Sequence, residues 1–202
     1  MPGPELVWYA GYGSNLWWPR FRCYLEGGIP PGSKRSHAGA RDPSAPLDDA
    51  ACWLPHPLVF ADASRTWGGG GVAYVDASVH VDGASRARRW LITAQQFSDV
   101  VAQEGGRQPG HDLDLAAAMQ KGSMTVGSSW YDLVLVVDDL AGVPVVTLTT
   151  SRPVSELLLN RPSKAYAETI ANGLKESHGL TEREVEMYLD AAAPAVSKDP
   201  GV

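Results

Sequence analysis

The stretch VWYAGYGSNL, from Val7 to Leu16, joins a short apolar run to a glycine-flanked Ser-Asn pair. A short apolar run bounded by turn residues is typical of a buried β-strand. Gly11 and Gly13 can adopt positive φ angles and bring backbone N–H groups close to a ligand, as in loops that bind a carboxylate or a developing oxyanion. The spacing alone leaves open a second interpretation, in which the glycines only make a tight turn.

Common cofactor and nucleophile motifs do not fit the chain. A dinucleotide-binding fingerprint needs a third glycine at the position that Leu16 occupies. The glycine run 68–71 lacks the Lys-Ser/Thr pair of a phosphate loop. Ser14 lies outside a G-x-S-x-G elbow and is therefore a poor candidate for a nucleophile. The histidines and cysteines show no metal-ligand spacing.

The composition predicts one globular domain over residues 1–202. The chain is 44% hydrophobic and 20% charged, with a formal net charge of −6. This acidic balance argues against a nucleic-acid or anionic-membrane partner, because both need concentrated positive charge. The sequence has neither a long apolar run nor a recognisable signal peptide, so a cytoplasmic protein is expected. In a reducing compartment Cys23 and Cys52 are expected to be free thiols.

Helix and strand signals interleave without the regular alternation of a doubly wound sheet, which predicts a mixed α/β or α+β fold. Thr93 and Gln96 form a capping-box pattern for a helix that ends at Glu104, and Thr181 and Glu184 form a second one. The remaining expected elements are strands at 58–61, 72–75 and 89–92, a hairpin of 131–137 and 143–149, a helix from Ser163 to Gly179, and an alanine-rich helix over 112–121.

Three segments are predicted to lie outside the regular elements. Residues 27–57 are rich in Gly, Pro, Ser and Asp and are expected to form a long irregular connection. Residues 106–127 are expected to be an insertion ahead of the hairpin, and residues 194–202 a flexible tail.

Two groups of side chains have a structural and a functional interpretation. Arg86, Arg88 and Arg89 are expected to make a solvated strand face, although one of them could bind a substrate carboxylate. Trp67, like the tryptophans that follow the first glycine segment, could form an apolar pocket wall, but core packing is the commoner fate of such a residue.

Glu104 is the carboxylate with the clearest functional position. Phe97, Val100 and Val101 precede it by seven, four and three residues, so it shares their apolar helix face. A carboxylate on a buried stripe is costly unless it is paired or lines a cavity, where it can serve as a general acid/base. Helix geometry leaves the alternative equally open, in which Glu104 turns outward at the helix end.

Three motifs occur together and in a consistent order. Tyr12-Gly13-Ser14-Asn15-Leu16 follows the first strand, Gln103-Glu104-Gly105 ends a helix, and Pro162-Ser163-Lys164-Ala165-Tyr166 begins the C-terminal helix. These motifs resemble the signature loop, the catalytic segment and the helix entry of the γ-glutamylcyclotransferase-like family, which includes γ-glutamylamine cyclotransferases and plant AIG2-like proteins. Residues 66–73 also resemble a glycine-containing approach to a strand in some members.

The resemblance implies a small mixed β-barrel with surrounding helices and a reaction that needs no cofactor and no metal. In that reaction the free α-amine of a γ-glutamyl group attacks its own γ-carbonyl, which closes 5-oxoproline and expels an amine or amino acid. The resemblance makes Glu104 the general acid/base and the Tyr12–Leu16 loop the substrate-binding segment. The implied partner is a small γ-glutamyl compound, and a monomer and a homodimer both remain open.

Departures from the family pattern leave the leaving group undetermined. The strand at 88–92 lacks the aliphatic-x-Gly pattern of many members, and the segment 106–127 is additional. A second hypothesis is therefore removal of a γ-glutamyl protecting group from a biosynthetic metabolite or carrier. A third, from another class, is a non-catalytic small-molecule-binding module in which Glu104 faces solvent.

Overall fold

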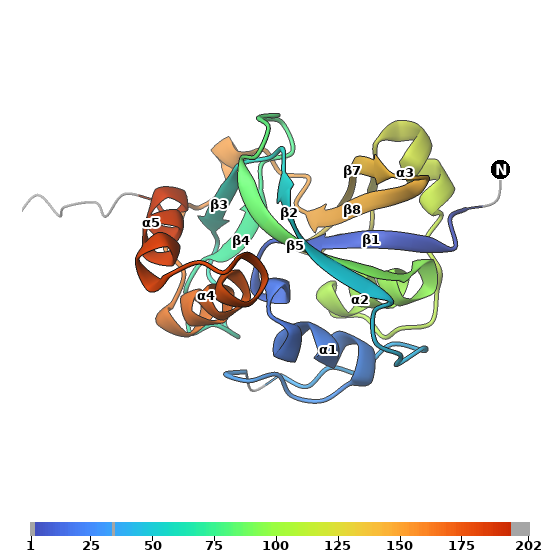
Figure 1. Cartoon of the computed structure of the whole chain (residues 1–202), viewed down its shortest axis with the longest axis horizontal. Coiled ribbons are helices and arrows are strands. Elements are labelled where there is room, and N and C mark those ends of the chain that lie inside the picture. Colours follow the sequence, from blue (N-terminus) through green and yellow to red (C-terminus); the bar gives the residue numbers. More distant parts are fainter. Residues whose placement is uncertain (1–2, 34, 195–202) are drawn as a thin grey trace, which may run out of the picture.

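The computed structural model describes residues 3–33 and 35–194 of the 202-residue chain, and it has the expected α+β architecture (Figure 1). A six-stranded sheet and a separate two-stranded sheet are surrounded by helices. The strands are β1 (Leu6–Gly11), β2 (Asp48–Leu54), β3 (Leu58–Ala61), β4 (Val72–Val75), β5 (Ser85–Thr93), β6 (Ser123–Thr125), β7 (Leu133–Leu140) and β8 (Val143–Thr149). The α-helices are α1 (Trp18–Glu26), α2 (Ala94–Glu104), α3 (Leu115–Lys121), α4 (Lys164–His178) and α5 (Glu182–Ala192). Two 3₁₀ turns are η1 (Ser14–Leu16) and η2 (Val154–Glu156).

Strand β1 lies inside the larger sheet, whose order is β2-β5-β1-β8-β7-β6. It pairs antiparallel with β5, where Tyr9 is opposite Trp90, and parallel with β8, where Tyr9 is opposite Val146. Strands β3 and β4 form their own antiparallel pair, so the described strands make two sheets rather than one closed ring. Thr149 connects the sheets, because its hydroxyl accepts from the Val75 N–H at 3.1 Å and donates to the Val75 carbonyl at 2.8 Å.

Side chains alternate along β1 between two hydrophobic cores. Val7 and Tyr9 pack into a core formed with α1, α2 and α3. Ala10, followed by Tyr12 just beyond the strand, packs into a second core formed with α4 and the β3–β4 pair. The chain therefore leaves β1 at the boundary between the two cores.

The helix boundaries predicted from capping patterns are confirmed. The Thr93 hydroxyl accepts from the Gln96 N–H, the Gln96 side chain accepts from the Thr93 N–H, and α2 runs from Ala94 to Glu104. Ser163 caps α4, which ends before Gly179 in a left-handed conformation, and Thr181 begins α5 with the second capping box. These signals are local, so they do not depend on tertiary contacts.

The prediction that residues 27–57 form a long irregular connection is wrong in its second half. Residues 48–54 form β2, which pairs with β5 along its whole length, from Asp48 opposite Leu91 to Leu54 opposite Ser85. The Asp-Asp-Ala-Ala sequence has low strand propensity, but strand formation depends strongly on the neighbouring strand. Helix α1, immediately after η1, was not predicted either.

The predictions for 112–121 and for the hairpin turn also need correction. Helix α3 begins only at Leu115, because the Asp114 side chain accepts from the Ala117 N–H and caps it there. Strand β7 continues to Leu140, beyond the expected end at residue 137, and Ala141 and Gly142 make a two-residue turn with φ angles of 55° and 86°. Within 106–127, β6 adds an edge strand to the sheet.

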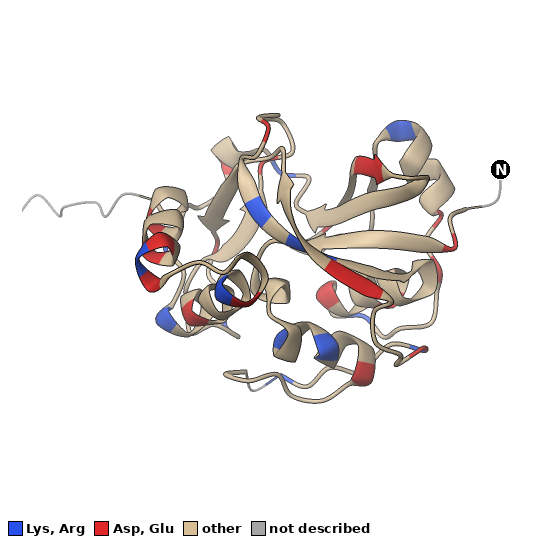
Figure 2. Cartoon of the chain, viewed as in Figure 1, with Lys and Arg blue, Asp and Glu red and all other residues tan. Residues whose placement is uncertain are grey.

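Arg88 does not belong to the solvated face that was predicted for the arginines of β5, whereas Arg86 and Arg89 are half-buried. The buried Arg88 side chain donates to Asp49 of β2 and to Glu176 of α4, both at 2.6 Å. Figure 2 shows the basic segments of β5 beside the acidic start of β2. Arg88 is therefore a structural ion-pair residue rather than a ligand for substrate.

Three expectations about the whole chain have different outcomes. Cys23 and Cys52 are free and buried. None of the described helices has the length and apolar character needed to cross a membrane. The tail predicted at 194–202 falls, except for Pro194, outside the described residues, and the assignment of 1–202 to one domain stays a prediction.

Candidate active site

The loop after β1 is held by close backbone packing. The expectation of positive φ angles at Gly11 and Gly13 is wrong, since Gly13 has φ −106° and ψ −135°. A Cβ atom at Gly13 would lie 2.9 Å from the Tyr166 hydroxyl oxygen, and one at Gly11 would lie 3.0 Å from the Asn15 Cβ atom. A side chain at Gly13 would therefore require Tyr166 to move, and one at Gly11 would require a smaller shift of Asn15, so both glycines permit close approach.

The η1 turn directs its side chains to different surroundings. Leu16 is completely buried and packs against Gly173 of α4, so it belongs to the core rather than to a binding surface. The Tyr12 hydroxyl donates to the Leu148 carbonyl at 2.7 Å. Tyr12 also lines a pocket, together with Gly13, Ser14 and Asn15. The first N–H groups of a helical turn have no partner within it, so those of Ser14 and Asn15 are potential donors to a ligand.

Glu104 faces this pocket and not the solvent beyond the end of α2. Its side chain is half-buried, and its Oε1 atom accepts from Asn15 Nδ2 at 3.0 Å. Asn15 Nδ2 also donates to the Tyr9 hydroxyl at 3.0 Å, and the Asn15 carbonyl accepts from the Trp90 indole at 3.0 Å. The inward alternative for Glu104 is the one that the structure shows, and Asn15 fixes its carboxylate at the pocket wall.

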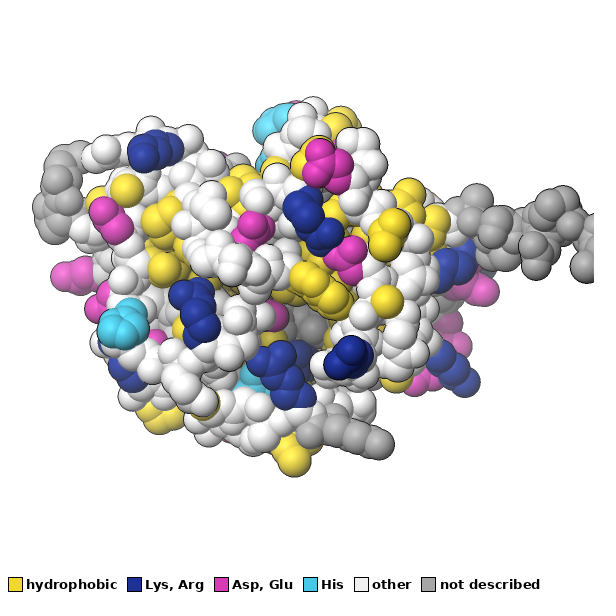
Figure 3. Space-filling model, turned by 180° about the vertical axis from the view of Figure 1, so that it is seen from behind, with side chains coloured by type: hydrophobic (Ala, Val, Ile, Leu, Met, Phe, Trp, Pro, Cys, Tyr) yellow, Lys and Arg dark blue, Asp and Glu magenta, His cyan; other side chains and the backbone are white. Residues whose placement is uncertain are grey.

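The pocket has a volume of about 580 Å³ and is formed by segments far apart in the sequence. Its walls come from the η1 loop, α1, the end of α2, residues 63–67, residues 128–131 and the start of α4. The molecule seen from behind has a hollowed face, with Lys and Arg side chains at its edge (Figure 3). The volume lies in the range usual for small-molecule sites.

Aromatic residues form one wall of the pocket. Trp67 is buried against Tyr166, with ring centroids 4.8 Å apart, so it serves both as pocket wall and as core. The Tyr166 hydroxyl accepts from the Ala73 N–H at 3.2 Å, and the Tyr131 hydroxyl donates to the Ala73 carbonyl at 2.8 Å. Burial raises the pKa of both tyrosines, so both remain neutral hydrogen-bonding groups near neutral pH.

Charges on the pocket wall are mostly positive. Arg20, Arg35 and Arg65 line the pocket, whereas Glu104 is the only acidic side chain among the described residues that do so. Arg20 is buried, and Arg35 donates to the Gln103 carbonyl at 3.3 Å. The wall thus combines one carboxylate with a cationic environment that suits an anionic ligand.

The Arg20 side chain lies within a set of neutral hydrogen-bond partners. It donates to Ser14 Oγ at 3.4 Å, to the Tyr24 hydroxyl at 3.1 Å and to His37 Nε2 at 2.7 Å. Burial, with the positive charges of Arg20 and Arg35, lowers the pKa of His37 to about 3. His37 is therefore neutral and accepts through Nε2, which places its ring proton on Nδ1.

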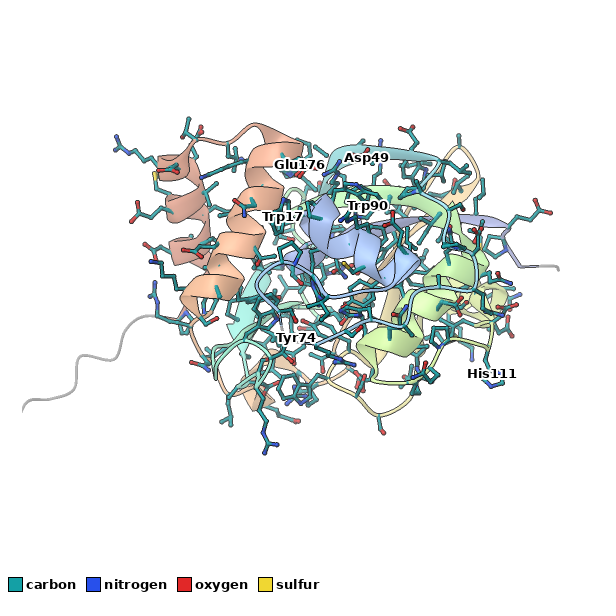
Figure 4. The ribbon with its side chains drawn as sticks, turned by 90° about the horizontal axis from the view of Figure 1, so that it is seen from below. Trp17, Asp49, Tyr74, Trp90, His111 and Glu176 are labelled. Carbon is teal, nitrogen blue, oxygen red and sulfur yellow. The ribbon has the colours of Figure 1, made fainter. Side chains whose placement is uncertain are left out.

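The pocket contains four of the five predicted loop residues, together with Glu104. Sequence reasoning missed Arg20, Tyr24 and His37, for which neither family motif nor spacing gave a signal. Arg88 of β5 lies elsewhere, because its partners Asp49 and Glu176 lie side by side and none of the three lines the pocket (Figure 4). Within residues 3–33 and 35–194, no three His, Cys, Asp or Glu side chains are grouped so that they could hold a metal ion.

Comparison with known proteins supports the fold. No family model matches the chain. Histone deacetylase 5 of Arabidopsis thaliana is 36% identical over 201 residues, which is 92% of this chain, but the chain spans only 30% of that relative's length. An uncharacterized human protein has a TM-score of 0.54, with 20% identity over 98% of this chain and 94% of its own. A solved γ-glutamyl cyclotransferase has a TM-score of 0.51, with 20% identity over 98% of this chain and 93% of its own. The chain therefore has the γ-glutamyl cyclotransferase fold, as the sequence motifs predicted.

Proposed function

We propose that this chain is a γ-glutamylcyclotransferase-like enzyme, which cleaves a γ-glutamyl amide to 5-oxoproline and a free amine or amino acid. The observation that carries the proposal is the Glu104 carboxylate, which Asn15 holds at the wall of a pocket bordered by the η1 loop. The likeness to a solved γ-glutamyl cyclotransferase supports it through the fold.

Glu104 has the chemistry that the cyclisation requires. It accepts a proton from the substrate α-ammonium, and the resulting amine forms a C–N bond to the γ-carbonyl carbon. As the original amide bond breaks, the leaving nitrogen takes the proton from Glu104. Overall, the α-ammonium loses two protons when it becomes the lactam N–H, and the leaving nitrogen gains two when it becomes a free ammonium group. Glu104 relays protons from one nitrogen to the other and ends in its starting protonation state. A positioned acid/base of this kind contributes about 10²–10⁴-fold to a rate.

The η1 loop supplies the second requirement, which is stabilisation of the oxyanion on the attacked carbonyl. We assign this role to the backbone N–H groups of Ser14 and Asn15, which begin the η1 turn at the pocket wall. Because nucleophile and electrophile belong to one molecule, the enzyme mainly has to hold the substrate folded. Such positioning can supply a large part of the acceleration in an intramolecular reaction.

The leaving group occupies the remainder of the pocket in this proposal. A cavity of about 580 Å³ has room for more than a γ-glutamyl group, and Arg35 and Arg65 make its surroundings basic. We therefore expect γ-glutamyl amino acids, whose leaving group carries a carboxylate, to be better substrates than γ-glutamyl amines. The size of the cavity also keeps larger γ-glutamyl-protected metabolites as a second candidate class.

The test is release of 5-oxoproline from a panel of γ-glutamyl amino acids, γ-glutamyl amines and larger γ-glutamyl amides. Glu104→Gln keeps the size of the side chain and an acceptor for Asn15, and it should lower kcat about 10²–10⁴-fold without preventing substrate binding. Glu186→Gln is the matched control, since Glu186 is exposed on α5 away from the pocket. Equal turnover by wild type and Glu104→Gln would refute the assigned role. Binding without any turnover would instead indicate a binding module.

A further inference from the structure

Arg20 is a buried cation that no carboxylate of the described residues contacts. Only 6% of the residue is exposed, and its three side-chain partners, Ser14, Tyr24 and His37, are all uncharged. None of the ion pairs formed by residues 3–33 and 35–194 involves it. A buried charge is costly unless a counter-charge compensates for it.

The neutrality of these partners follows from their surroundings. The pKa of His37 is lowered to about 3, first by burial and then by Arg20 and Arg35. Burial, opposed by Arg20 and assisted by Glu104, raises the pKa of Tyr24 well above its usual value. Near neutral pH both groups hold the guanidinium in place without cancelling its charge.

Another arginine of the same protein shows the contrast. Arg88 is also buried, but it contacts Asp49 and Glu176, both at 2.6 Å. Arg88 therefore carries its counter-charges within the fold, whereas Arg20 lines an open pocket. Although burial opposes the shift, Tyr24 and then the charge of Glu104 raise the pKa of Arg20. Glu104 forms no ion pair with it, so the carboxylate contact that Arg20 lacks can come from a ligand.

The positions of Arg20 and Glu104 define what that ligand carries. Neighbouring residues of η1 hold them, because Ser14 accepts from Arg20 and Asn15 donates to Glu104. Both side chains line the same pocket, but they are not ion-paired with one another. A cation and an anion separated on one wall match the α-carboxylate and α-ammonium of an amino-acid head group.

We propose that Arg20 binds the α-carboxylate of the γ-glutamyl substrate while Glu104 receives its α-ammonium. This inference rests on the proposed cyclotransferase function and narrows its substrate class to γ-glutamyl compounds with both α-groups free. Guanidinium and carboxylate form strong, directional hydrogen bonds, so the contact fixes the orientation of the head group. Arg20 thereby turns the α-amine toward Glu104 and the γ-carbonyl toward the η1 loop.

Two substrates that differ only in the α-carboxylate separate this role from a structural one. A γ-glutamyl 4-nitroanilide closes to 5-oxoproline and a 4-aminobutanoyl 4-nitroanilide closes to 2-pyrrolidinone, and both release the same yellow 4-nitroaniline. Wild type should favour the γ-glutamyl compound in kcat/KM by about tenfold to hundredfold. In Arg20→Gln this preference should fall close to one, and Arg20→Lys should retain part of it. Arg22→Gln, an exposed position on the same helix, should leave it unchanged.

The outcomes distinguish this inference from the proposed function. If Arg20→Gln slows both substrates by the same factor, Arg20 is structural and the inference is overturned. If wild type releases neither lactam from the anilides and no 5-oxoproline from the γ-glutamyl panel, the proposed function fails. If only the anilides are not turned over, the proposed function stands; in both cases calorimetric titration with 5-oxoproline tests the carboxylate site alone. Binding that weakens at least tenfold in Arg20→Gln and persists in Arg22→Gln supports the site. Absence of binding, or equal binding by all three proteins, overturns it.

Discussion

Gly173 gives the sharpest test of how α4 holds the candidate site, because two physical effects on this residue have opposite signs. Replacing glycine with alanine inside a helix normally stabilises it by about 1 kcal/mol. Here the new Cβ atom would lie 2.4 Å from Leu16 Cβ, 2.7 Å from the Leu16 carbonyl carbon and 2.8 Å from the Trp17 nitrogen. Backbone atoms cannot rotate away, so we take about 3 kcal/mol, the upper end of the overpacking range. Gly173→Ala should therefore lose about 2 kcal/mol of stability, which is roughly 30-fold in the folding equilibrium.

Urea unfolding measures this loss in the free energy of unfolding. In thermal unfolding, the Tm of Gly173→Ala should be about 4–8 °C lower than that of wild type for a chain of this size. Asn172→Ala is the matched control, since Asn172 is exposed on the same helix and its replacement should be neutral or slightly stabilising. Gly173→Ala should also lower turnover, because the displaced segment carries Ser14 and Asn15. If Gly173→Ala is as stable as wild type, the close packing of α4 against η1 is not what holds the loop.

Two further predictions concern polar groups around the pocket. The pKa of His37 is lowered in the folded state to about 3, so the unfolded chain binds the proton more readily, and stability should be full above about pH 6.5 and decrease as pH falls toward 3. Urea midpoints from pH 7 to 4 should decline more steeply for wild type than for His37→Gln, and parallel declines would contradict the assigned environment. Asn15→Ala should reduce kcat more than it raises KM, because it frees the Glu104 carboxylate while the Trp90 bond to the Asn15 backbone remains. Steady-state kinetics would contradict this if only KM changed.

The elements predicted correctly from sequence are those with local signals. The capping boxes at Thr93 and Thr181 and the serine cap at Ser163 each fix a helix start through contacts within four residues. The apolar run before Gly11 is likewise enough to predict β1. Such signals act over a few residues and can be read without knowing the tertiary structure.

The features that sequence reasoning missed depend on partners far along the chain. Strand β2 exists because β5 offers a complete set of backbone partners about forty residues later. The ion pairs of Arg88 join three elements, and the bond from Arg20 to His37 joins α1 to the connection that follows it. Neither residue type nor spacing encodes such pairings, since many arginines and histidines in the chain could have formed them.

The same distinction applies within the candidate site. The motif with Glu104 could be recognised in the sequence, but the two orientations of its side chain could not be separated by helix periodicity. Asn15 decides between them, because its amide nitrogen binds both Tyr9 and the carboxylate at 3.0 Å. The orientation of a helix-end residue thus depends on the loop packed against it.

The opening stretch combines structural and functional roles because its residues alternate between the core and the pocket. Tyr12 and Leu16 are buried, one bonded to β8 and the other packed against Gly173 of α4. These two fixed points leave the residues between them little freedom, so Ser14 and Asn15 are held where they contact Arg20 and Glu104. Rigid support of this kind is what a positioned acid/base needs, since small displacements of reacting groups cost large factors in rate. The small size of Gly11 and Gly13 lets the loop pack closely, and this packing brings Asn15 within hydrogen-bond distance of the Glu104 carboxylate at the end of α2.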